Sequence, residues 1–159
     1  MFAFGHLFIG WLIGLFIGNI RGRKLSDLSW GLLLFGSLLP DIDYLFDFVF
    51  GTGVHRTLTH SIFFLVVAFM VCYIVLKFMK LEKYSWFFAL GIFSHIVVDM
   101  FWPMGVTLFW PLLDFISINF ISNSVGSAGI SRAGLLMLDS AFGIIWLSVL
   151  FLQRKIKLS

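Results

Sequence analysis

Long apolar stretches alternate with short polar connections along the whole chain. Five of these stretches approach the length of about 20 helical residues needed to cross a hydrocarbon core about 30 Å thick. They cover residues 4–20, 28–46, 57–78, 84–102 and 133–152. The short segments of alternating polarity that build a transmembrane β-barrel are absent from the pattern. We therefore predict an all-α, polytopic membrane helix bundle of about five transmembrane helices.

The connection between the fourth and fifth stretches, residues 102–132, is long and irregular. It contains Pro103, Gly105 and Pro111, and its second half is rich in serine and glycine. Non-helical backbone at membrane depth must be surrounded by protein or water. We expect this connection to form an irregular or re-entrant element on the outer face.

The composition agrees with a membrane solvent. Of the 159 residues, 60% are hydrophobic and only 12% are charged, which leaves too little polar surface to cover a water-soluble globule. A chain of this length is most simply one domain. We predict a single integral membrane domain over residues 1–159.

Basic residues fall in three groups, after the first stretch, between the third and fourth, and after the fifth. They are Arg21, Arg23, Lys24, Lys77, Lys80, Lys83, Arg154, Lys155 and Lys157. Lys and Arg mark cytoplasmic connections, so the N-terminus is predicted outside the cell membrane and the C-terminus inside. These groups form no basic stripe with interleaved aromatic residues, so we expect membrane lipids and no nucleic acid as partners.

Ionisable side chains lie within or beside the apolar stretches. Such groups are costly in hydrocarbon and persist where they pair, bind an ion or line a cavity. Counted from the cytoplasmic helix ends, they lie about 17–26 Å up, in one layer of the outer membrane half. The layer holds His6, Asp41, Asp43, His60, His95, Asp99 and Asp139. Because the lower helix halves are almost purely apolar, we expect a recess that opens to the outside.

The spacing within the helices favours a shared site. His95 and Asp99 are four residues apart, which puts them on one helix face, either as two ligands of one metal or as a ligand and its orienting partner. Asp41 and Asp43 follow Pro40 and are two residues apart, so on a regular helix they would diverge. If both bind, the backbone turns there or they serve two metals. The simpler alternatives are a buried interhelical pair for the first two and a helix end at the interface for the second two.

A mixed set of Asp and His suits zinc, manganese or iron, whereas an all-oxygen set would favour calcium or magnesium. We predict one to three divalent metal ions, with zinc favoured and manganese, iron or magnesium as alternatives. The predicted ligands are His6, Asp41, Asp43, His60, His95 and Asp99. His60 is expected on the first turn of the third helix. His55 and Arg56 precede it and are the predicted catalytic residues that handle a phosphate, although an ordinary headgroup contact would also explain Arg56.

Three segments together resemble a known family. They are Gly36-Ser-Leu-Leu-Pro-Asp-Ile-Asp43, His55-Arg-Thr-Leu-Thr-His-Ser61 and Gly91-Ile-Phe-Ser-His-Ile-Val-Val-Asp99. With His6 and Gly105-Val-Thr-Leu-Phe-Trp-Pro111, they resemble the YdjM family over residues 5–111. The resemblance implies a LexA-regulated, membrane-bound, metal-dependent hydrolase. It also implies a distant grouping with zinc-dependent phospholipases C and single-strand nucleases.

We predict a hydrolase in which metal-activated water cleaves a phosphoester bond of a phospholipid or lipid-linked substrate. In one alternative, the polar layer is a binding site along the path of a metal- or proton-coupled transporter or channel. In another, the metal only stabilises the fold of a membrane protein.

Overall fold

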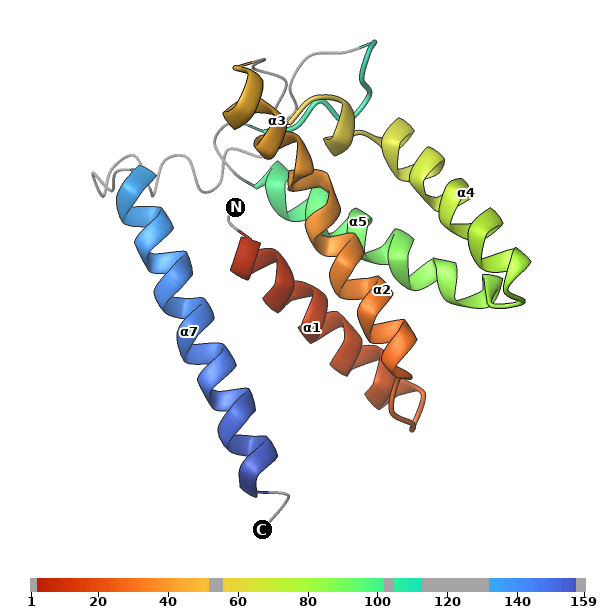
Figure 1. Ribbon diagram of the computed structural model, residues 1–159, viewed down its shortest axis with the longest axis vertical. Coiled ribbons are helices and arrows are strands. Elements are labelled where there is room, and N and C mark those ends of the chain that lie inside the picture. Colours follow the sequence, from red (N-terminus) through yellow and green to blue (C-terminus); the bar gives the residue numbers. More distant parts are fainter. Residues whose placement is uncertain (1–2, 52–55, 102–104, 113–131, 157–159) are drawn as a thin grey trace.

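Helices form every regular element of the computed structural model, which describes residues 3–51, 56–101, 105–112 and 132–156 (Figure 1). The α-helices are α1 (Ala3–Ile20), α2 (Asp27–Leu38), α3 (Ile42–Phe50), α4 (Ile62–Phe78), α5 (Ser85–Met100) and α7 (Arg132–Ile156). Three short 3-10 turns are η1 (Leu39–Asp41), η2 (Leu58–His60) and η3 (Glu82–Tyr84). The predicted all-α class is confirmed for this part of the chain.

The second predicted stretch is broken, and it is longer than expected. We predicted one helix over residues 28–46, but α2 gives way to η1 at Leu39 and α3 then continues to Phe50. Pro40 accounts for the break, because it lacks an N–H and its ring clashes with the preceding helical turn. Gly51 ends α3 in the left-handed conformation, with its N–H donated to the carbonyl oxygen of Asp47 at 2.8 Å.

The third predicted stretch also begins differently. Helix α4 starts at Ile62, and the Ser61 side chain caps it by accepting a hydrogen bond from the Phe64 N–H at 3.1 Å. His60 therefore lies in the η2 turn before α4 instead of on its first turn. Of the predicted irregular connection, residues 105–112 and Arg132 belong to the described chain; residues 105–112 contain no helix, and Arg132 begins α7.

Helices α2 and α5 pack backbone against backbone. A Cβ atom added to Gly36 would lie 2.3 Å from the carbonyl oxygen of Phe88, and one added to Gly91 would lie 2.2 Å from that of Leu33. Small residues permit this approach between helices in a membrane. A buried core of Phe88, Ile92, Ile96 and Val106 adjoins the contact. The helix crossing therefore brings the end of α2 against the second half of α5.

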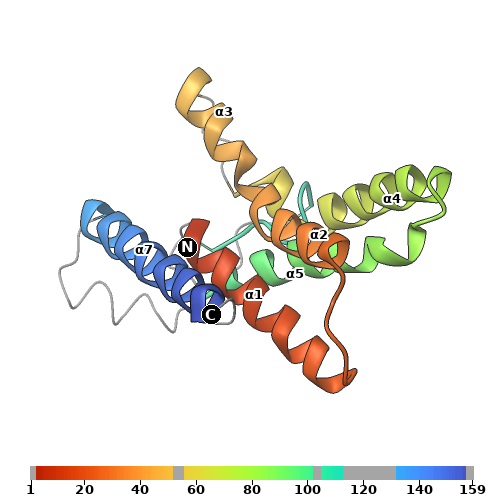
Figure 2. The ribbon, with the colours of Figure 1, turned by 60° about the horizontal axis from the view of Figure 1, so that its bottom comes forward.

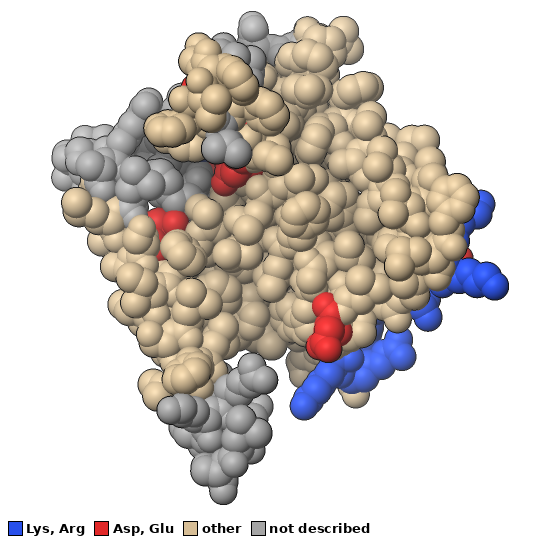
Figure 3. All heavy atoms as spheres, in the orientation of Figure 1, with Lys and Arg blue, Asp and Glu red and all other residues tan. Residues whose placement is uncertain are grey.

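Much of the surface is apolar. In the part that the structure describes, α1 is the one helix that is long and apolar enough to cross a membrane, and Ile62–Phe78 and Met137–Leu152 are shorter apolar helices. Lys and Arg side chains gather over the turns that join α1 to α2 and α4 to α5 (Figure 3). The five crossings and their orientation stay predictions.

Substitution at the α2–α5 contact should be costly. In Gly91→Ala, the added methyl group would overlap the Leu33 carbonyl and push the helices apart, and such overpacking costs about 1–3 kcal/mol. We expect a melting temperature lower by about 5 °C in detergent. In the control Gly31→Ala, the new Cβ has no neighbour within 4 Å. If the two variants had the same melting temperature, the close backbone contact between α2 and α5 would be contradicted.

Candidate metal centre

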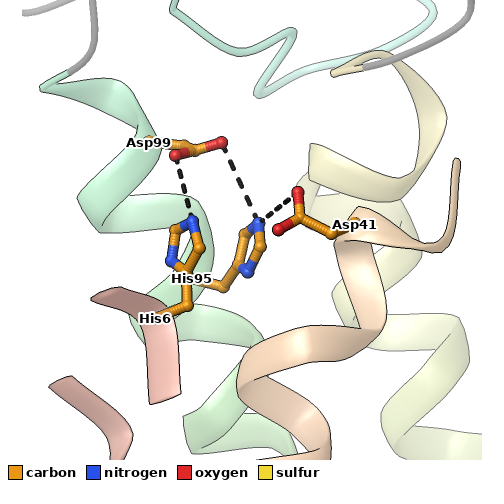
Figure 4. Close-up of side chains that lie close together, drawn as sticks. All are labelled: His6, Asp41, His95 and Asp99. Atoms are coloured by element: carbon orange, nitrogen blue, oxygen red, sulfur yellow. Dashed lines mark ion pairs between the residues drawn. The ribbon is translucent and has the colours of Figure 1, made fainter. Parts of the chain in front are cut away.

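Four ionisable side chains from three segments converge in the interior of the bundle (Figure 4). His6 comes from α1, Asp41 from η1, and His95 and Asp99 from α5. One ligand atom of each lies within 4.8 Å of the others. His6, His95 and Asp99 are fully buried, and the Asp41 side chain is 23% exposed. This group can hold a metal ion.

His60 adds a fifth donor to the group. Its Nε2 lies 3.1 Å from His95 Nε2, 3.4 Å from Asp99 Oδ2 and 3.8 Å from Asp41 Oδ1. His95 Nε2 in turn lies 3.5 Å from Asp41 Oδ1 and 3.9 Å from Asp99 Oδ2. Tetrahedral ligands about 2.0–2.2 Å from zinc stand about 3.3–3.6 Å apart. The five distances of 3.1–3.9 Å bracket that range, so a metal ion could be held by these four residues after small shifts of their side chains.

Backbone and carboxylate partners turn both imidazoles toward the group. His95 Nδ1 lies 2.7 Å from the carbonyl oxygen of Ser37 and donates to it, which leaves the Nε2 lone pair free for a metal. His60 Nδ1 lies 3.3 Å from Asp43 Oδ2 and 3.1 Å from Thr59 Oγ1. Both arrangements are typical of histidines that bind metals.

Asp43 lies behind His60, outside the four-residue group. Besides His60, its Oδ2 accepts hydrogen bonds from the backbone N–H of Arg56 at 3.0 Å and from the Thr59 hydroxyl. Because the helix breaks at Pro40, Asp41 and Asp43 both point toward the candidate metal centre although they are only two residues apart. The prediction did not include this link between Thr59 and Asp43, and the only sequence signal for it is the position of Thr59 next to His60.

His6 is buried without ordinary hydrogen bonds. Its ring stacks on that of His95, with centroids 3.6 Å apart and planes 13° apart. Nε2 lies 3.3 Å from Asp99 Oδ1, and neither ring nitrogen has a hydrogen-bond partner among the described residues. A buried polar atom of this kind calls for a further partner. A metal ion would supply one.

The guanidinium group of Arg56 faces the carboxylate of Asp99. Its Nη2 lies 3.3 Å from Asp99 Oδ2, and its Nη1 donates to the Gly105 carbonyl oxygen at 3.5 Å. The backbone of Arg56 has a φ of 67°, and its carbonyl oxygen accepts from the N–H and hydroxyl of Thr107, each at 3.2 Å. A buried, permanently cationic fork thus borders the acidic group. The predicted His55 lies outside the described residues.

Asp139 of α7 holds the start of α1. Its two carboxylate oxygens accept the backbone N–H groups of Phe4 at 3.1 Å and Gly5 at 2.9 Å. The first N–H groups of a helix lack partners within the helix, and a carboxylate there also favours the helix dipole. Gly143 of α7 leaves room for the Phe4 ring. Asp139 therefore positions the helix turn that carries His6.

The buried His and Asp residues define a candidate metal centre in a helical protein whose described surface is largely apolar. The chain matches the YdjM inner membrane protein family over residues 1–156, and it belongs to this family. Comparison with the curated proteins and with the solved structures finds no match. The family resemblance and the membrane location are confirmed.

Removal of the Asp139 carboxylate should loosen the start of α1. We expect Asp139→Ala to lower the free energy of unfolding by about 1 kcal/mol, as for other helix caps, and to weaken zinc binding through His6. Thermal unfolding with and without zinc measures both effects. Ser148→Ala, which alters an exposed hydroxyl on the same helix, is the control. Asp139→Ala that melts and binds zinc like this control would refute the role.

Proposed function

We propose that the protein is a membrane-embedded metal-dependent hydrolase that cleaves a phosphoester bond in a lipid or lipid-linked substrate. The main support is the guanidinium group of Arg56, 3.3 Å from Asp99, beside donor atoms that fit a metal ion. Phosphoryl chemistry requires positive charge on the phosphate oxygens and an activated water molecule. This combination favours a phosphoester over an uncharged substrate.

The donor atoms have distinct roles in this proposal. Asp41, His60, His95 and Asp99 would hold the metal, and zinc suits their mixed nitrogen and oxygen donors. His6 faces the second oxygen of Asp99, where it adds a ligand to this ion or to a second one. We assign Asp43 to the orientation of His60 instead of direct metal binding, because it faces Nδ1.

A bound divalent metal ion supplies a Lewis acid that promotes ionisation of water and polarises a phosphoryl oxygen. Arg56 binds the phosphate through two parallel N–H groups, for which its planar fork is suited. Asp99 and the Gly105 carbonyl keep that fork in place before substrate arrives. Asp41, the most exposed member of the group, marks the side from which water and substrate enter.

The helix next to Asp41 supports a lipid substrate. Helix α3 follows Asp41 directly and extends away from the other helices (Figure 2). It exposes large apolar side chains, among them Tyr44, Phe46, Phe48 and Phe50. An acyl chain can lie against this helix while its phosphate reaches Arg56.

Substitution of a proposed ligand should remove activity. We expect His95→Ala to lose bound zinc and to reduce zinc-dependent release of phospholipid headgroups in nanodiscs to the uncatalysed level. Ser94→Ala changes the preceding residue, whose hydroxyl donates to the Gly91 carbonyl oxygen at 2.8 Å within the same helix, and should keep both properties. Hydrolysis that persists in metal-depleted wild-type protein would contradict the proposal.

Arg56 should affect turnover and leave metal binding intact. We expect Arg56→Gln to keep the zinc content of the wild type while headgroup release falls about 100-fold, the loss typical of a removed charge-stabilising donor. Arg56→Lys retains the charge but loses the fork, so it should restore only part of the rate. Zinc content and initial rates are measured on the same preparations. Wild-type turnover in Arg56→Gln would exclude the phosphate-binding role.

A structural metal site is the second candidate. The observation in its favour is that the chain offers four donor residues, the number a closed structural zinc site uses, and that three of the four side chains are fully buried. In that case zinc would raise the melting temperature of wild type but not of His95→Ala, and no zinc-dependent headgroup release would accompany it.

A further inference from the structure

A groove lies between the second half of α1 and the start of α2. Its volume is about 780 Å³, within the range of about 300–1,000 Å³ common for ligand pockets. Gly18, which lines it, is twelve residues beyond His6 on α1. This places the groove about 18 Å from the candidate metal centre along the helix axis, so it is a separate feature.

Glycine shapes the floor of this groove. Gly14 and Gly18 lie one helical turn apart on α1, and the Trp30 ring of α2 occupies the space where a Gly14 side chain would be. Gly22 has a φ of 61°, and just after it the Arg23 N–H bonds to the carbonyl oxygen of Gly18 at 3.1 Å. This tight turn folds the chain back, so that Arg23 lies beside Gly18 at the groove.

The rim of the groove is cationic. Arg23 and Lys24 line it and are exposed, with Asp27 as the carboxylate among the lining residues. Leu15, Leu25 and Trp30 make the rest of the lining largely apolar. In Figure 3 Lys and Arg side chains gather at this end of the molecule. An apolar floor beneath two cations and one carboxylate is complementary to one anionic phosphate that carries an acyl chain.

We propose that this groove is a binding site for an anionic phospholipid, independent of the candidate metal centre. The phosphate contacts Arg23 and Lys24, and the start of one acyl chain lies over Gly18 against Trp30. Basic residues next to membrane helices attract anionic headgroups. The groove adds a shaped apolar surface that selects a lipid over a soluble phosphate.

Native mass spectrometry of the full chain with added phosphatidylglycerol tests this site. Wild type should retain one phosphatidylglycerol more firmly than phosphatidylethanolamine. The double variant Arg23→Gln, Lys24→Gln should bind it about 30-fold more weakly, since each basic residue near the membrane surface strengthens binding of an anionic lipid about 5-fold. The matched control Lys77→Gln, Lys83→Gln removes the same charge from the α4–α5 turn and should bind like wild type.

A second pair of variants tests the groove itself. Gly18→Leu fills the floor, where a new Cβ meets only the Arg23 carbonyl oxygen at 3.4 Å, and should weaken the bound lipid. Gly31→Leu adds the same side chain to α2 in open space and should not. Equal lipid retention by the two glycine variants, equal loss in the two charge variants, or displacement by soluble glycerol phosphate would each overturn the proposal. Zinc content, unchanged in all four, separates this result from that of the metal centre.

Discussion

The close approach of α2 and α5 is the constraint on which the candidate site depends. Gly36 and Gly91 let the two backbones touch, and the Ser37 carbonyl oxygen at the end of α2 then meets His95 Nδ1 at 2.7 Å. This hydrogen bond fixes the tautomer and orientation of the imidazole, because a carbonyl oxygen can only accept. With His95 fixed, the stacked His6 and the facing Asp41 and His60 have a defined point of convergence.

A second requirement is that buried charge in an apolar protein be compensated. Asp99 has His6 on one oxygen and Arg56 and His60 on the other. The partners come from α1 and from residues 56–60, which end in η2, so the carboxylate links these two parts of the chain to α5 at one place. Such pairing lowers the cost of ionisable groups away from water, and it leaves nitrogen and oxygen atoms directed at a common centre. The same contacts that stabilise the bundle can therefore hold a metal ion.

Much of this arrangement could be predicted from the sequence. Helical periodicity placed His95 and Asp99 on one face, and depth along the helices brought His6, Asp41 and His60 to the same layer as Asp99. Other features depend on tertiary contacts that no local pattern encodes. The Asp139 carboxylate shares the layer but caps α1, and Asp43 lies behind His60, because helix packing and the break at Pro40 decide where each oxygen points. The glycine contacts between α2 and α5 likewise could not be predicted from either helix alone, because they depend on how the two helices pack.

X-ray absorption spectroscopy of the zinc-loaded protein would show directly whether the His and Asp cluster binds the metal. We expect one tightly bound zinc ion with a shell of nitrogen and oxygen ligands about 2.0–2.2 Å away and the multiple-scattering signal of at least two imidazoles. Zinc bound with a sulfur ligand at about 2.3 Å, which Cys72 would have to provide, or a shell without imidazole would contradict it.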